Sequence, residues 1–175
     1  MIKDIFKPNY FQLFSQPMQY DLNIEALQES LVELQKRFHP DNFVNQDPAL
    51  ANQAILASSQ INQAFVTLKE PLSRAIYLLG LHGLTVDLVH DTKFTPEFLM
   101  AQIELREEIA EAEAEFDIDK LIEIESNLRQ QKAELVAEIN SLFTQQKFAL
   151  IAEQIKKLAF YDKLEQYAGN IIAQL

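Results

Sequence analysis

Residues 23–48 read NIEALQESLVELQKRFHPDNFVNQDP and carry the clearest structural pattern of the chain. Its apolar side chains recur at steps of three and four residues, so they share one helical face: Ile24, Leu27, Leu31, Leu34 and Phe38. Asn23 suits the N-cap, and Pro40 ends the helix near Arg37 because a proline pushes the preceding residue out of the helical backbone region. Asp47-Pro48 then matches the N-cap and first position of a second helix. The stretch therefore predicts two helices joined by a polar loop.

A second apolar stripe follows this loop and completes a helical hairpin. Its members repeat with helical spacing from residue 50 onward: Leu50, Ala54, Ala57, Ile61, Ala64 or Phe65, and Leu68. The two helices can pair antiparallel, which leaves the connecting sequence HPDNFVNQD facing solvent. Before them, the aromatic segment 10–14 predicts one helical turn packed on a neighbour. After them, Glu70-Pro71 begins another helix, which Gly80 and Gly83 terminate.

Three further helices are predicted in the second half of the chain. After a stretch without helical periodicity, helices begin after Thr95, after Asp117 and near Phe148. Three consecutive helices with short connections favour an antiparallel bundle. Only three glycines in 175 residues leave little material for hairpin turns between strands. We therefore predict an all-α chain, with a helical-hairpin domain at 1–83 and a three-helix bundle at 90–175.

Charge and composition exclude several classes of function. The chain carries 26 acidic and 15 basic side chains, a net charge of −11, and residues 97–125 alone hold eleven acids against Arg106 and Lys120. Such an acidic surface repels the phosphates of a nucleic acid. The absence of cysteine excludes thiol catalysis and thiolate metal ligands, and it is compatible with a reducing cytoplasm. No 18 apolar residues follow one another, and charges interrupt the first 14 residues, so we expect neither a membrane span nor an export signal.

The loop tripeptide His39-Pro40-Asp41 has two interpretations. It is a helix stop if His39 interacts with the C-terminal dipole of the first helix and the other two residues only shape the turn. It is a recognition site if Asp41 offers its carboxylate to a partner's guanidinium while Pro40 fixes the backbone on which both neighbours project. Lys36 and Arg37 add a small positive patch that suits an acidic partner surface.

The helix from residue 96 to about 116 has two different faces. At about 100° per residue, one sector of the helical wheel forms a core stripe: Phe98, Leu105, Ile109, Ala112 and Phe116. The opposite sector, which we call the acidic-apolar face, joins an apolar cluster to a ladder of glutamates: Leu99, Met100 and Ile103 with Glu104, Glu107 and Glu111. Either its apolar residues pack under another segment and its glutamates are solvated, or the face binds a partner.

Four segments, spread over nearly the whole chain, carry a resemblance to a known family. They are NYFQLF, LQKRFHPDNF, INQAFVTLKEPLSRAIYLL and FLMAQIELREEI, which begin at residues 9, 34, 61 and 98. Together they resemble the HscB family, the J-domain co-chaperones of bacterial iron–sulfur cluster assembly. The resemblance implies that the domain at 1–83 is a J-domain that docks on the DnaK-type chaperone HscA and stimulates its ATPase.

The same resemblance implies that the bundle at 90–175 binds the iron–sulfur scaffold protein IscU. The expected binding surface is the acidic-apolar face together with Phe160, although the apolar pattern of the last helix leaves open whether that ring points outward. One residue departs from the family pattern, because Asn42 stands where J-domains usually have a lysine. One favourable charge is therefore missing from the expected chaperone-docking face.

Other functions fit parts of this pattern. A J-domain protein with a different client would keep the HPD loop and have no link to iron–sulfur assembly, and a structural helical adaptor would use the loop only as a turn. An enzyme with His39 and Asp41 as acid and base is the most remote, since adjacent loop residues beside a proline offer no pocket. His39, His82 and His90 lack the close spacing of a metal site, so we expect no metal, no cofactor and no enzymatic activity.

Overall fold

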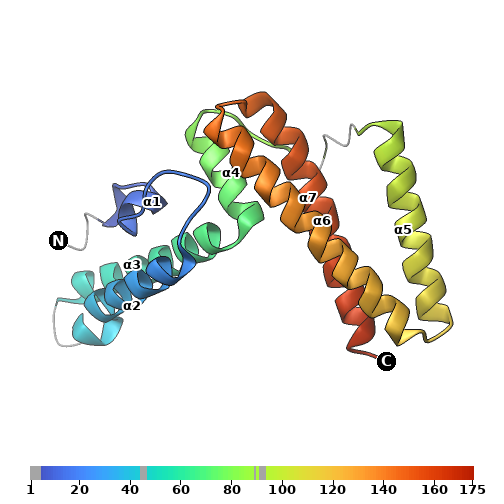
Figure 1. Ribbon diagram of the computed structural model, residues 1–175. Coiled ribbons are helices and arrows are strands. Elements are labelled where there is room, and N and C mark those ends of the chain that lie inside the picture. The colour runs from blue at the N-terminus through green and yellow to red at the C-terminus, as the bar shows by residue number, and fades with distance from the viewer. Residues whose placement is uncertain (1–4, 44–46, 89, 91–93) are drawn as a thin grey trace. The chain divides into compact units, whose positions relative to one another are not determined.

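The computed structural model describes most of the chain, namely residues 5–43, 47–88, 90 and 94–175. The chain divides into two compact units, of which unit 1 comprises Met1–Gly83 and unit 2 comprises Leu84–Leu175. Every regular element in the described residues is helical (Figure 1). The prediction of an all-α chain is therefore confirmed.

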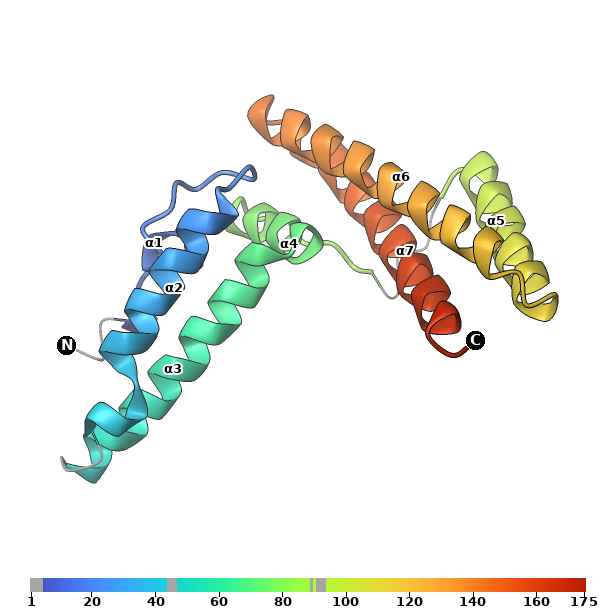
Figure 2. The same cartoon turned by 60° about the horizontal axis from the view of Figure 1, so that its bottom comes forward.

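Unit 1 is built on an antiparallel hairpin of α2 (Ile24–Phe38) and α3 (Pro48–Lys69), which lie side by side in Figure 2. The short α1 (Tyr10–Leu13) and α4 (Pro71–Leu81) both contact α3. The hairpin buries most of the two predicted stripes: Leu27, Phe38, Ala54, Ala57, Ile61, Ala64 and Leu68. The prediction for Leu50 is wrong, because the first turn of α3 lies beyond the end of α2 and leaves this side chain exposed.

Side-chain caps fix the starts of both hairpin helices, as the sequence predicts. The Asn23 side chain accepts a hydrogen bond from the Ala26 amide at 3.1 Å, and the Asp47 carboxylate accepts one from the Ala49 amide at 2.9 Å. Each bond satisfies a backbone donor that has no partner within its helix. The caps therefore set where α2 and α3 begin.

The aromatic segment before the hairpin forms the predicted helical turn and attaches to a neighbour. Phe11 and Phe14 are buried. The Tyr10 ring stacks on Tyr77 of α4 with ring centroids 4.4 Å apart, and the Tyr10 amide donates a 2.9 Å hydrogen bond to the Tyr77 hydroxyl. Both ring packing and a hydrogen bond thus hold α1 to α4.

Arg74 is a buried structural residue that the helical pattern does not identify. Its Nη1 atom donates a 2.9 Å hydrogen bond to the Tyr20 carbonyl, and its guanidinium lies 5.2 Å from the centroid of the Tyr20 ring. Burial raises the pKa of Tyr20 to about 12. Burial also lowers the pKa of Arg74, although its acidic neighbours oppose that shift. The contact fixes the loop before α2 to α4.

Unit 2 is an antiparallel bundle of α5 (Pro96–Ala114), α6 (Ile118–Thr144) and α7 (Phe148–Ile172). The helices α6 and α7 run side by side, and α5 packs along one part of this pair (Figures 1 and 2). That part holds a core cluster of buried residues: Ile109, Ala112, Leu121, Ile124, Leu128, Leu164, Ala168 and Ile171. The predicted three-helix bundle is therefore confirmed.

Phe116 does not belong to this core, so its predicted place in the core stripe is wrong. Its side chain is 72% exposed, whereas Ile109 and Ala112 of the same predicted stripe are buried. The reason is that α5 ends at Ala114, two residues earlier than the helical wheel assumes. Phe116 then adopts a left-handed backbone conformation with φ of 55°, which turns its side chain away from the helix face.

Candidate functional site

The HPD loop lies at one end of the α2–α3 hairpin. His39 ends α2 with φ of −58° and ψ of 131°, so the backbone leaves the helix at this residue, before Pro40. Pro40–Phe43 then form a short 3-10 turn, labelled η2. This turn leaves the Asp41 side chain 82% exposed, with its carboxylate available to a partner.

Contacts within the loop hold the tripeptide in shape. The Asp41 amide donates to His39 Nδ1 at 3.3 Å, and the same ring nitrogen lies 3.5 Å from Asp41 Oδ2. Both contacts hold the His39 ring against Asp41 within the loop.

Asn42, the residue that departs from the usual J-domain pattern, has a structural role. Its Nδ2 atom donates a 2.9 Å hydrogen bond to the Lys36 carbonyl, and its amide donates to the His39 carbonyl at 3.0 Å. The Lys36 carbonyl lies in the last turn of α2, where carbonyls lack partners within the helix. Asn42 thus caps the end of α2 and fixes the HPD loop to it. No periodic pattern indicates this bond, because the two residues lie six apart across a turn.

Two exposed cations stand beside the loop, as predicted. Lys36 and Arg37 occupy the last turn of α2, where the helix dipole favours positive charge. The Arg37 guanidinium also lies 5.1 Å from the centroid of the Phe38 ring. The structure therefore brings all five predicted chaperone-docking residues together at one end of the hairpin: Lys36, Arg37, His39, Pro40 and Asp41.

The second candidate surface is the acidic-apolar face of α5. Its apolar members are well exposed, with Leu99 at 43%, Met100 at 57% and Ile103 at 52%. Its three glutamates, Glu104, Glu107 and Glu111, are exposed as well. The predicted separation of this face from the bundle core agrees with these exposures, and no segment among the described residues covers the three apolar side chains.

Phe160, whose orientation the sequence leaves open, lies at the seam between α7 and α5. Its ring centroid lies 5.6 Å from that of Phe98 and 5.5 Å from that of Tyr161. The guanidinium of Arg106 lies 5.5 Å from the centroid of the same ring. Phe160 is therefore half-buried, and only part of its ring can face a partner.

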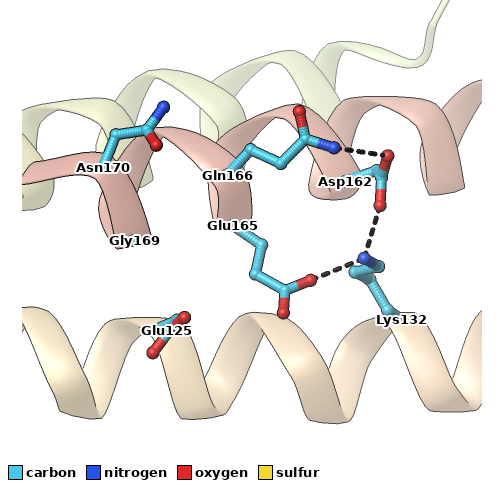
Figure 3. Close-up of a pocket in the computed structure, with 7 residues that line it drawn as sticks. All are labelled: Glu125, Lys132, Asp162, Glu165, Gln166, Gly169 and Asn170. Carbon is cyan, nitrogen blue, oxygen red and sulfur yellow. Dashed lines mark hydrogen bonds and ion pairs between the residues drawn. The ribbon is translucent and has the colours of Figure 1, made fainter. Parts of the chain in front are cut away.

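An ionic network joins α6 to α7 beside an open pocket of about 460 Å³ (Figure 3). Lys132 Nζ lies 2.5 Å from both Asp162 Oδ1 and Glu165 Oε2, and Arg129 bonds Glu165 at 3.0 Å. Burial alone would lower the pKa of Lys132 and raise that of Glu165, but the hydrogen bonds outweigh burial and shift both pKa values the other way. These charges satisfy one another, so the network stabilises the helix pair.

The described part of the chain holds neither a metal-binding cluster nor a membrane-spanning helix. Its histidines, aspartates and glutamates form no group of three that could hold a metal ion. None of its helices combines the length and apolarity required to cross a bilayer.

Comparisons with known proteins agree with these features. Residues 94–168 match the family model described as the HSCB C-terminal oligomerisation domain. The chain is 37% identical over 163 residues to a co-chaperone protein HscB homolog of Neisseria meningitidis, covering 93% of this chain and 98% of that protein. Two solved structures are similar. The chaperone HscB from Vibrio cholerae has a TM-score of 0.87 and 36% identity, covering 96% of this chain and 99% of that one. Human co-chaperone HscB has a TM-score of 0.88 and 29% identity, covering 94% and 82%.

An exposed HPD loop on a helical hairpin, followed by a helical bundle, defines the class of J-type co-chaperones. A co-chaperone performs no catalysis of its own. The chain belongs to the HscB co-chaperone family. Its role is accordingly that of a J-type co-chaperone in iron–sulfur cluster assembly, and it is not an enzyme.

Proposed function

We propose that this protein docks on an HscA-type chaperone through its HPD loop, stimulates the ATPase of that chaperone and delivers an IscU-type scaffold to it. Residues 1–83 act as the J-domain and residues 90–175 as the scaffold-binding domain, with the cytoplasm as the expected location. The observation that carries the proposal is the exposed Asp41 carboxylate, held beside two exposed cations at the end of a capped hairpin. No nucleic acid or membrane takes part.

The chaperone contact changes an equilibrium and involves no chemistry on the J-domain. A protein that stimulates a partner's ATPase must bind two conformations of the partner with different affinity. Asp41 suits this task because its exposed carboxylate can form a bidentate pair with an arginine of the chaperone. The affinities differ if that arginine is accessible in only one of the two chaperone conformations. Lys36 and Arg37 would speed the encounter with an acidic surface.

The scaffold contact uses the acidic-apolar face of α5. Exposed leucine, methionine and isoleucine side chains supply apolar anchors, and the neighbouring glutamates supply electrostatic complementarity to a basic surface. The part of the Phe160 ring that remains accessible would extend the same contact onto α7.

Single-turnover ATP hydrolysis by the chaperone tests the first contact. Asp41→Asn is expected to abolish stimulation without unfolding unit 1, because the side chain is largely in solvent. Glu29→Gln is the matched control, since it removes one exposed carboxylate from the same unit outside the loop. Full stimulation by Asp41→Asn would contradict the proposal.

Calorimetric titration with an IscU-type scaffold tests the second contact. Leu99→Ala combined with Met100→Ala should weaken binding and leave ATPase stimulation in the absence of scaffold unchanged. Wild-type stimulation without any scaffold binding would instead favour a J-domain protein that serves a different client. Neither stimulation nor binding would favour a structural helical adaptor.

We also infer that unit 2 associates with a second copy of itself. The matched family model is described as an oligomerisation domain, and an apolar patch surrounds the turn between α5 and α6, formed by Phe116, Ile118 and Ile122. Sedimentation equilibrium should show a concentration-dependent dimer that Phe116→Ser weakens. A monomer at all concentrations would contradict this inference.

A further inference from the structure

A small basic pocket lies at the α5–α7 seam of unit 2, apart from the network of Figure 3. Its volume is about 130 Å³. Its walls combine apolar side chains with three cations: Leu88, Phe94, Ala159 and Phe160 with Arg106, Lys156 and Lys163. The described lining residues include no carboxylate, so none of them repels an anion.

This concentration of cations contrasts with the rest of unit 2. Residues 84–175 contain nine basic and eighteen acidic side chains, yet three of the nine bases line this one pocket. Arg106 is the single base of α5, which carries six acids. A positive pocket within an acidic surface is a distinct electrostatic feature that attracts negative groups.

Two of these cations have no ionic partner among the described residues. Elsewhere in the unit, four basic side chains pair with carboxylates of the same unit: Lys120, Arg129, Lys132 and Lys157. Arg106 instead rests on the Phe160 ring, and Lys163 forms no ion pair with the described part of the chain. Stacking orients the Arg106 guanidinium while leaving its donors available for a carboxylate.

The pocket adjoins the apolar part of the acidic-apolar face. Arg106 follows Ile103 by three residues and Leu99 by seven, and these spacings place all three on one side of α5. A protein that covers Leu99 and Ile103 would therefore pass close to the pocket. The pocket volume of about 130 Å³ is room for a small group such as a carboxylate side chain.

We propose that this pocket receives a carboxylate side chain of the scaffold protein that binds α5. The proposal rests on the scaffold-binding role proposed above and adds a second recognition element of opposite charge. The glutamates of α5 would meet basic groups of the scaffold, while Arg106 and Lys163 would meet an acidic one. Two patches of opposite sign fix the orientation of a bound partner better than one, because a rotated partner brings like charges together.

Calorimetric titration of the full chain with an IscU-type scaffold tests the pocket. Lys163→Glu should weaken binding by about threefold to tenfold at low salt, with a smaller effect at high salt. Lys147→Glu is the matched control, because Lys147 is an exposed lysine without an ion pair in the described residues and stands at the start of α7, the helix that carries Lys163. It precedes Lys163 by sixteen residues, or about 24 Å of helix, so its affinity should stay within about twofold of wild type.

A third variant, Leu99→Ala, separates failure of the pocket from failure of the proposed function. If Leu99→Ala weakens binding but Lys163→Glu binds like Lys147→Glu, the pocket assignment is wrong and the scaffold-binding role stands. If the wild-type chain does not bind the scaffold, both are wrong. Saturable binding of inorganic phosphate that Lys163→Glu abolishes would identify a free-anion site and overturn the assignment to a partner's carboxylate.

Discussion

Two isoleucines on α5 offer a direct comparison of a core position with a surface position. Ile109 is fully buried in the core cluster of unit 2, whereas Ile103 on the acidic-apolar face is 52% exposed. Both lie inside the same helix, so replacing each with alanine deletes the same atoms in the same secondary structure. Any difference between the two variants therefore reports burial.

The two substitutions should lower the free energy of unfolding by different amounts. Ile109→Ala should lower the free energy of unfolding by about 2–5 kcal/mol, since it combines lost burial with a cavity. Ile103→Ala should remove only about half of the roughly 1.5–3 kcal/mol that a fully buried isoleucine contributes. Because alanine has a better helix propensity than isoleucine, it adds a few tenths of a kcal/mol to the free energy of unfolding. The net cost of Ile103→Ala is therefore about 0.5–1 kcal/mol.

Hydrogen exchange read by mass spectrometry is the suitable assay, because the two units can unfold separately and circular dichroism would sum them. Peptides that cover Leu121–Leu128 of α6 report the opening of the unit 2 core. Affinity for the scaffold should rank the variants in the opposite order. Ile103→Ala should weaken the complex, and Ile109→Ala should leave the affinity of the folded protein unchanged. Equal destabilisation by both variants would refute the assignment of Ile103 to the surface.

Three other changes test charges elsewhere in the molecule. Lys36→Ala with Arg37→Ala should slow association with the chaperone and flatten its salt dependence in stopped-flow measurements, because exposed charges act through a screening length of about 8 Å; unchanged salt slopes would contradict a docking role. Asn42→Lys should speed the same association, yet lower the stability of unit 1 by about 0.5–1.5 kcal/mol through the lost cap, as hydrogen exchange in α2 would show. Glu165→Gln should destabilise unit 2 by about 1–2 kcal/mol at neutral pH, since it breaks the partly buried pair with Lys132. The folded state lowers the pKa of Glu165 below 4.5, so this stabilisation is complete above that pH and is lost as pH falls through the folded pKa; an effect independent of pH would refute it.

The spacing of apolar residues predicts most of this fold, because a helix that buries one face repeats its apolar side chains every three or four residues. The spacing from Ile24 to Phe38 and the caps at Asn23 and Asp47 predict the hairpin to within a residue. The same periodicity separates Ile109 from Ile103 on α5. It fails at Phe116, since a helical wheel extends a helix that the backbone has already ended.

Contacts between residues far apart in the sequence cannot be predicted from this local spacing. Arg74 meets Tyr20 across 54 residues, and Lys132 meets Asp162 across 30. Each of these residues taken alone reads as an ordinary charged or aromatic side chain on a helix or loop. The basic pocket was missed for the same reason, because Arg106 and Lys163 come together only when α5 packs on α7.

The shallow attachment of α5 has a thermodynamic consequence. Only two of its nineteen residues are buried, against seven of twenty-five in α7, so α5 gains less from packing than the helix beneath it. Such a helix opens locally at a lower free energy than the core it covers. A partner that binds α5 supplies the missing contacts. Part of the binding free energy is then offset by the conformational entropy that α5 loses when it is held in place. Complex formation should then show a negative heat-capacity change larger than the interface alone would give.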